Sequence, residues 1–180
     1  MRPAPLRLLV VAALCLGGAA CTRPSPPPAD PTPTDEPAPM ADNATVLDAG
    51  LADAAVQQCS RESPETEGSW TPTPRDVANL EANLPALREM ESDVCCGGRT
   101  ARVEDPDAFY RQYVGVVVGG RRLIYVNAFA RNTFEHWPEA DRPDWRREPQ
   151  TVCDGGESFW GVLYDPERRT FSHLAFNGSA

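Results

Sequence analysis

Residues 110–129, YRQYVGVVVGGRRLIYVNAF, determine the fold of this 180-residue chain. Two runs rich in β-branched and aromatic residues, 110–118 and 121–129, flank Gly119 and Gly120. Two glycines between such runs predict a tight β-hairpin, because the favoured two-residue turns need positive φ angles. The hairpin is therefore the element from which the other elements are placed.

The position of the turn also fixes which residues pair across the hairpin. We expect one ladder to join Val118 with Arg121, Val116 with Leu123 and Val114 with Tyr125, and the other to join Val117 with Arg122, Gly115 with Ile124 and Tyr113 with Val126. Both ladders are apolar in the middle of the strands. This pattern predicts a central hairpin with chain packed on each face.

A helix is predicted before the hairpin. Thr73 can cap it, Pro74 suits its first turn, and Asp76 can reach back to the capping residue. Apolar side chains then recur at helical spacing, at Val77, Leu80, Leu84 and Leu87. Pro85 lacks an amide hydrogen, so we expect it to kink the helix or to break it into two short helices.

Three more strands are predicted after the hairpin, at 150–153, 159–164 and 171–176. Turns at 154–156 and 165–166 separate them. The polar residues 132–147 are expected to form a long loop. The predicted fold class is α+β, with one kinked N-terminal helix packed on a four- to five-stranded antiparallel meander sheet.

The N-terminal residues 1–20 have the pattern of a secretory signal peptide. Arg2 and Arg7 precede or border an apolar run at 8–16, and small residues lead into Cys21. The segment resembles a bacterial lipoprotein signal, which implies a lipid attached to Cys21. Gly18 stands where that signal prefers leucine, and cleavage by an ordinary signal peptidase is the alternative. Thr22, rather than aspartate, after the cysteine resembles the sorting signal for the outer membrane.

Residues 21–58 are expected to be a lipid-anchored, proline-rich, disordered linker. Eight prolines lie between Thr22 and Pro39, with almost no apolar side chains to bury. Such a chain favours the extended polyproline II conformation. Residues 41–58 are open to a second interpretation, a short helix that carries Leu47, Leu51 and Val56. A single α+β domain is predicted over 59–180.

Charge and composition exclude several classes of function. The net charge is −9 and approaches −11 once the two signal-peptide arginines leave, which argues against nucleic acid and anionic lipid headgroups as partners. The chain contains no lysine, so a Schiff-base mechanism is excluded. No zinc-protease or hydrolase spacing of histidines and serines occurs, and no metal or other cofactor is expected.

Four cysteines of the predicted domain are candidates for disulfides: Cys59, Cys95, Cys96 and Cys153. An even number of cysteines in an oxidising compartment usually forms bridges. Adjacent cysteines make a strained pair, so we expect Cys95 and Cys96 each to bridge to one of the other two. A zinc site is the weaker interpretation because separated C-x-x-C pairs are absent. A thiol–disulfide protein would need Cys95 and Cys96 to be exposed and reducible.

Several short motifs resemble a family of uncharacterised bacterial lipoproteins. They are CDGG at 153–156, FWG at 159–161, YDP at 164–166 and FNG at 176–178, together with 70–72, 80–85 and 123–127. The resemblance covers most of 59–180 and implies no activity. The order of helix and strands is also similar to cystatin-like folds, an analogy of fold that says nothing about function.

Two sets of residues are candidates for a site. Asp154 lies on a glycine-rich turn and, with His136 or His173 and Asp165, could serve a small hydrolase; a turn-stabilising role is the commoner one for such an aspartate. Trp137, Trp145 and Trp160 could share the rim of a protein-binding groove, although aromatic residues of this kind more often pack in the core.

We therefore predict a non-enzymatic lipoprotein, anchored by its lipid in the outer membrane and facing the periplasm. Its domain is expected to bind an envelope protein or a cell-wall component. The rival hypothesis is a small periplasmic hydrolase that uses Asp154 and a histidine. A deep pocket joining these residues would favour the enzyme, and an aromatic groove would favour binding.

Overall fold

The central hairpin consists of β5 (Phe109–Val118) and β6 (Arg121–Ala130). A computed structural model describes residues 39–94 and 99–178, and all statements below concern these residues. All six predicted cross-strand pairs are present, from Val118 with Arg121 to Tyr113 with Val126. Gly119 and Gly120 have φ angles of 56° and 70°. These angles match the primed turn that the two glycines predicted.

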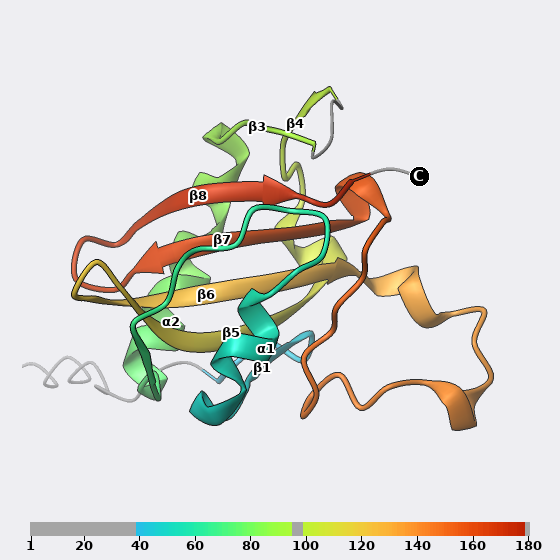
Figure 1. The fold of residues 1–180 in the computed structure, drawn as a ribbon, viewed down its shortest axis with the longest axis horizontal. Coiled ribbons are helices and arrows are strands. Elements are labelled where there is room, and N and C mark those ends of the chain that lie inside the picture. Colours follow the sequence, from blue (N-terminus) through green and yellow to red (C-terminus); the bar gives the residue numbers. More distant parts are fainter. Residues whose placement is uncertain (1–38, 95–98, 179–180) are drawn as a thin grey trace, which may run out of the picture. The chain divides into compact units, whose positions relative to one another are not determined.

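The hairpin lies in the middle of a six-stranded sheet (Figure 1). On one side β7 (Phe159–Asp165) pairs antiparallel with β6, and β8 (Thr170–Phe176) pairs antiparallel with β7. On the other side β1 (Ala44–Val46) runs parallel to β5, and β2 (Gly68–Trp70) pairs antiparallel with it. The sheet is mixed, so the prediction of a purely antiparallel meander is wrong.

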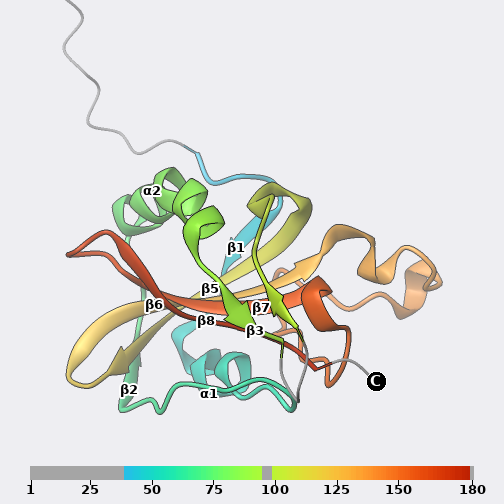
Figure 2. The ribbon, with the colours of Figure 1, turned by 90° about the horizontal axis from the view of Figure 1, so that it is seen from above.

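Two helical layers cover the two faces of the sheet. α2 (Pro74–Asn83) lies on one face, and η1 (Ala49–Leu51) with α1 (Ala52–Val56) lies on the other (Figure 2). Each layer buries its own apolar cluster against the hairpin, since Ile124 and Val126 point toward α2, and Val114 and Tyr125 toward α1. The predicted packing on both faces of the hairpin is confirmed.

The predicted helix begins where its sequence indicates. Thr73 and Asp76 form a capping box, in which the hydroxyl of Thr73 accepts from the Asp76 amide and the Asp76 carboxylate accepts from the Thr73 amide. Its four predicted apolar positions are all buried. A kink is not seen, and the other alternative, a break into two short helices, matches the structure: α2 ends at Asn83, and the 3-10 helix η2 (Leu84–Glu89) follows, with Pro85 in its first turn.

The described residues before Cys59 belong to the folded unit: the sequence left 41–58 open between a linker and a short helix, and α1 is a short helix within this range. Ala44 on β1 is fully buried, and Leu47, Ala55 and Val56 pack against the hairpin. The sequence predicts these elements only weakly, because β1 and α1 are three and five residues long and show little periodicity. The linker and signal-peptide predictions for residues 1–38, including lipid attachment at Cys21, lie outside the described residues.

The strand predicted at 150–153 does not form. Amide side chains of the sheet bind the backbone of this segment instead: Gln112 accepts from the Gln150 amide, and Asn127 donates to the carbonyl of Gln150. These bonds satisfy backbone groups that a strand would otherwise direct to a neighbouring strand. The segment is therefore held across the sheet as an irregular loop.

The remaining elements are short. They are the two-stranded sheet of β3 (Ser92–Asp93) and β4 (Thr100–Ala101), and the 3-10 helices η3 (Pro106–Ala108), η4 (Arg131–Phe134), η5 (Glu139–Asp141) and η6 (Gly156–Ser158). None of the helices in the described ranges is long and apolar enough to cross a membrane.

Candidate functional site

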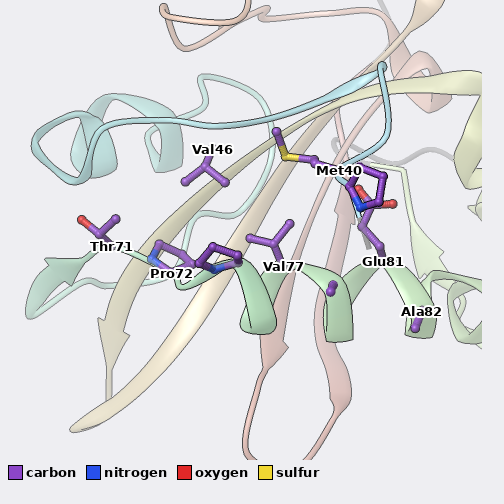
Figure 3. A pocket seen from close by; sticks show the side chains of 10 residues that line it. Met40, Val46, Thr71, Pro72, Val77, Glu81 and Ala82 are labelled. Carbon is purple, nitrogen blue, oxygen red and sulfur yellow. The ribbon is translucent and has the colours of Figure 1, made fainter. Parts of the chain in front are cut away.

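An apolar groove runs between α2 and the segment that leads into β1. It has a volume of about 570 Å³. Figure 3 shows Met40 and Val46 on one side of the groove, and Pro72 and Val77 facing them from the other side. The remaining lining residues are Pro39, Thr71, Pro74, Ala78, Glu81 and Ala82. Only Thr71 and Glu81 contribute polar side chains to this surface.

Local structure explains why this face of α2 is open. The helix places Val77, Ala78, Glu81 and Ala82 along one stripe, because residues three and four apart share a face. The two alanines are too small to reach β1, which leaves room between the helix and the strand. Met40, which is 41% exposed, is flexible enough to fit ligands of different shape.

A buried polar cluster borders the groove at Glu81. The Tyr113 hydroxyl donates to the Glu81 carboxylate at 2.6 Å, and Nη2 of Arg111 donates to it at 3.1 Å. Arg111 is fully buried and also donates to the Tyr113 hydroxyl and to the carbonyl of Pro106. Both oxygens of the carboxylate therefore accept from the protein, and the Glu81 side chain, which is 20% exposed, still borders the groove.

The same cluster shifts two pKa values. Burial raises the pKa of Tyr113 well above its usual 10.0, and the neighbouring Glu81 charge adds to this increase. Burial lowers the pKa of Arg111, but Tyr113 and Glu81 outweigh it, and the pKa of Arg111 is raised overall. The cluster thus holds a neutral phenol and a charged guanidinium, a structural arrangement rather than one that exchanges protons near neutral pH.

We expect the free energy of unfolding to fall as the pH rises above about 10, the ordinary pKa of a tyrosine. Above this pH the unfolded chain loses the Tyr113 proton while the folded chain keeps it. The loss is up to about 1.4 kcal/mol per pH unit until the folded pKa is reached. Urea unfolding at pH 8 to 11 measures it, and Tyr113→Phe should reduce the slope. An equal slope in Tyr113→Phe would contradict the assignment.

The three tryptophans predicted to share a rim do not do so. Trp160 is fully buried under α2 and packs edge-on against Phe109. Trp145 is half-buried and packs against Tyr110, whereas Trp137 is 49% exposed and contacts Phe134. The expectation of core packing is correct for Trp160, whereas Trp137 and Trp145 lie on the loop that follows β6.

The candidate catalytic residues are dispersed over the described structure. Asp154 is exposed in its turn, and Asp165 caps the following turn by accepting from the amides of Glu167 and Arg168. His136 is exposed. His173 is exposed at an irregularity of β8, with a φ of 57°, and lines a hollow of about 90 Å³ to which neither aspartate contributes.

The disulfide pairing differs from the predicted one. Cys59 is bonded to Cys153, so neither of them is available to Cys95 or Cys96. The adjacent pair lies outside the described residues. The bond joins the chain before β2 to the end of the loop at 145–153, two segments that only the tertiary structure brings together. Within the described ranges, no three His, Cys, Asp or Glu side chains are grouped as metal ligands.

Sequence reasoning missed the groove and its polar border. One signal was present: Glu81 follows Val77 by four residues, so it lies next to the apolar stripe of the predicted helix. Arg111 and Tyr113 likewise share one face of β5, which predicts a polar contact with whatever covers that face. Met40 and Val46 line the other side of the groove. The sequence did not predict this role, because their segment was assigned to the linker.

Comparison of the chain with protein families, with curated proteins and with solved structures finds no match.

Proposed function

We propose that this protein is a lipid-anchored envelope protein whose folded unit binds, without catalysis, the hydrocarbon chain of an envelope lipid. The groove between α2 and β1 is the binding site. The observation that supports this proposal is the apolar character of the groove, in which the Glu81 carboxylate is already engaged by Tyr113 and Arg111.

The small number of polar groups favours a hydrocarbon over an extended peptide, since Thr71 and Glu81 carry the only polar side chains among the lining residues. An extended peptide would bring more backbone amides than these two side chains can pair, and each unpaired group costs about 1–3 kcal/mol. A hydrocarbon chain carries no such groups and gains about 0.8 kcal/mol for each buried methylene. Ten buried methylenes would contribute about 8 kcal/mol, from which the cost of ordering the bound chain must be subtracted.

The predicted anchor is consistent with this ligand. Pro39 and Met40 line the groove, and Cys21 precedes them along the chain. An extended linker of about 3.1 Å per residue would keep the groove within roughly 55 Å of a membrane that holds Cys21. Detection of an acylated Cys21 at the mature N-terminus by mass spectrometry tests this placement separately.

Binding of fatty acids of increasing length tests the ligand. We expect the affinity to rise steeply from octanoate to dodecanoate in calorimetric titrations, by about two hundredfold if all four added methylenes are buried. Ala78→Trp should fill the groove and weaken dodecanoate binding at least tenfold. Ala54→Trp, on the exposed face of α1 and thus on the other side of the sheet, is the matched control and should bind as the native chain does.

Thermal unfolding of both variants shows whether either substitution disturbs the fold. An affinity that does not depend on chain length, or that is equal in Ala78→Trp and Ala54→Trp, would disprove the groove as a hydrocarbon site.

A further inference from the structure

Two adjoining hollows lie where β5 begins and β6 ends, on the loop side of the molecule. Their volumes are about 210 and 380 Å³, and they share Tyr110, Arg131 and Trp145. Asp42, Asn43 and Arg146 complete the smaller hollow. Phe134, Glu135, Arg142 and Pro143 complete the larger one.

Aromatic rings form the shared wall of the hollows. The rings of Tyr110 and Trp145 lie 4.5 Å apart at an angle of 32°, and both rest on Phe129, which is fully buried. Phe134 also packs against Phe129. The wall is therefore fixed by the sheet beneath it, although Trp145 itself comes from a loop. A rigid ring surface of this kind is suited to stacking against a flat ligand.

Three arginines surround the aromatic wall, and no carboxylate of the described residues pairs with them. Arg131 lies over the Tyr110 ring at 5.9 Å, and Arg146 lies over the Trp145 ring at 4.5 Å. Arg146 also donates to the carbonyls of Ala44 and Asp42, and Arg142 donates to those of Trp137 and Glu135.

None of these three arginines forms an ion pair with a carboxylate within residues 39–94 and 99–178. In the rest of the described structure, a carboxylate pairs with each of Arg99, Arg102, Arg111, Arg121, Arg147 and Arg168, whereas Arg61, Arg88, Arg122 and Arg169 also form no ion pair there. The carboxylates that line the hollows belong to Asp42 and Glu135, so the three guanidiniums outnumber the acids there. The lining residues therefore carry three positive and two negative charges, in a chain with a net charge of −9.

We propose that these hollows bind a saccharide that carries an anionic group. The C–H face of the sugar stacks on the Tyr110–Trp145 wall, because the negative face of an aromatic ring attracts the weakly positive C–H groups. The carboxylate or phosphate of the sugar accepts from Arg131, which is common to both hollows, and from Arg142 or Arg146. Guanidinium groups bind such anions through two parallel hydrogen bonds.

The positions of the arginines favour this ligand over a simple anion. Stacking on a ring and bonding to backbone carbonyls hold each guanidinium in place, but neither contact neutralises its charge. A bound anion would supply the missing charge at little cost in side-chain ordering. The shared aromatic wall would add affinity only for a ligand that also has a face to stack.

This inference is independent of the proposed hydrocarbon site. The groove is lined by Pro39, Met40, Val46 and residues of 71–82, whereas the hollows are lined by Asp42, Asn43, Tyr110 and residues of 131–146, so no residue lines both sites. Loss of one site should leave ligand binding at the other unchanged, so the two proposals fail separately.

Titration of the folded protein with four probes tests the inference: glucuronate, glucose, glucose 6-phosphate and acetate. NMR of the tryptophan indole groups reports the site. We expect glucuronate or glucose 6-phosphate to shift the Trp145 signal with a dissociation constant of about 1 mM. Glucose lacks the anion and acetate lacks the ring, so each should bind at least tenfold more weakly.

Charge-removing variants provide the control. Arg131→Gln should weaken binding of the anionic sugar about tenfold. Arg147→Gln is matched to it, since Arg147 lies in the same loop but pairs with Asp144 and lines neither hollow. The dissociation constant of Arg147→Gln for the anionic sugar should lie within twofold of that of the native protein. Equal binding of glucuronate and glucose, equal binding of glucuronate and acetate, or equal weakening by the two variants would overturn the proposal.

Discussion

Glu81→Ala should lower the free energy of unfolding by about 3 kcal/mol. The substitution removes the carboxylate that faces Arg111, whose side chain is fully buried, and it leaves the Tyr113 hydroxyl without its acceptor. Breaking a buried ion pair from one side typically costs about 3–5 kcal/mol. We expect the lower end of this range because Asp107 remains 3.3 Å from Arg111, although its own side chain is exposed. Urea unfolding monitored by circular dichroism measures the change.

A surface ion pair provides the control for this prediction. Glu157 pairs with Arg99, and their side chains are 40% and 81% exposed. Glu157→Ala should therefore cost less than about 1 kcal/mol. The triple variant Glu81→Leu, Arg111→Met and Tyr113→Phe replaces the buried polar cluster by apolar side chains. It should lower the free energy of unfolding by less than Glu81→Ala alone does. If Glu81→Ala lowered the free energy of unfolding by no more than Glu157→Ala does, the buried polar cluster would contribute little to stability.

Removal of the Cys59–Cys153 bond should have an even larger effect. The bond closes a loop with a sequence separation of 94 residues. In the chain-entropy description, a loop of this length contributes about 4–5 kcal/mol by restricting the unfolded chain. The double variant Cys59→Ala with Cys153→Ala should lose roughly this amount, measured by urea unfolding of both proteins under oxidising conditions.

Peptide mapping provides the independent check on this pairing. Proteolysis without reduction, followed by mass spectrometry, should release the Cys59 peptide joined to the Cys153 peptide. A Cys59 peptide joined instead to one that contains Cys95 or Cys96 would restore the pairing that the sequence predicted. It would also remove the basis for the expected loss of stability.

The sequence was most informative where a structure depends on neighbours along the chain. The Gly119-Gly120 turn fixed every predicted pair of the hairpin, because a two-residue turn leaves one register that keeps both apolar ladders aligned. The start of α2 was equally clear, since Thr73 and Asp76 interact within four residues. β7 and β8 were also correct to within one residue at either end.

The errors concern contacts between distant segments. β1 pairs with β5 although Ala44 and Arg111 are far apart in the sequence, and three residues carry too little pattern to reveal it. The expected strand at 150–153 has a suitable composition, but the side-chain amides of Gln112 and Asn127 bind this stretch instead. No local rule predicts such a competition between side chains and strand partners.

The candidate sites depend even more strongly on the tertiary structure. Residues from 39–46 and 71–82 line the groove, and the hollows combine Tyr110 with Trp145 and three arginines. The sequence singled out Trp145 as a possible binding residue but placed it with Trp160, which lies under α2 on the far side of the wall formed by the sheet. Alternation along a strand decides the face of each residue, but only packing decides what covers that face.

By itself, the sequence determined the hairpin register, the capped helix and the mixed α and β composition, because turns, caps and periodicity act over a few residues. Only the tertiary structure decided the parallel edge strand, the Cys59–Cys153 pairing, the apolar groove and the arginine-lined hollows. Each of these joins segments that meet only after the chain has folded, and many pairings of distant segments satisfy the same local preferences. Burial of the apolar faces on both sides of β5 and β6 selects among them.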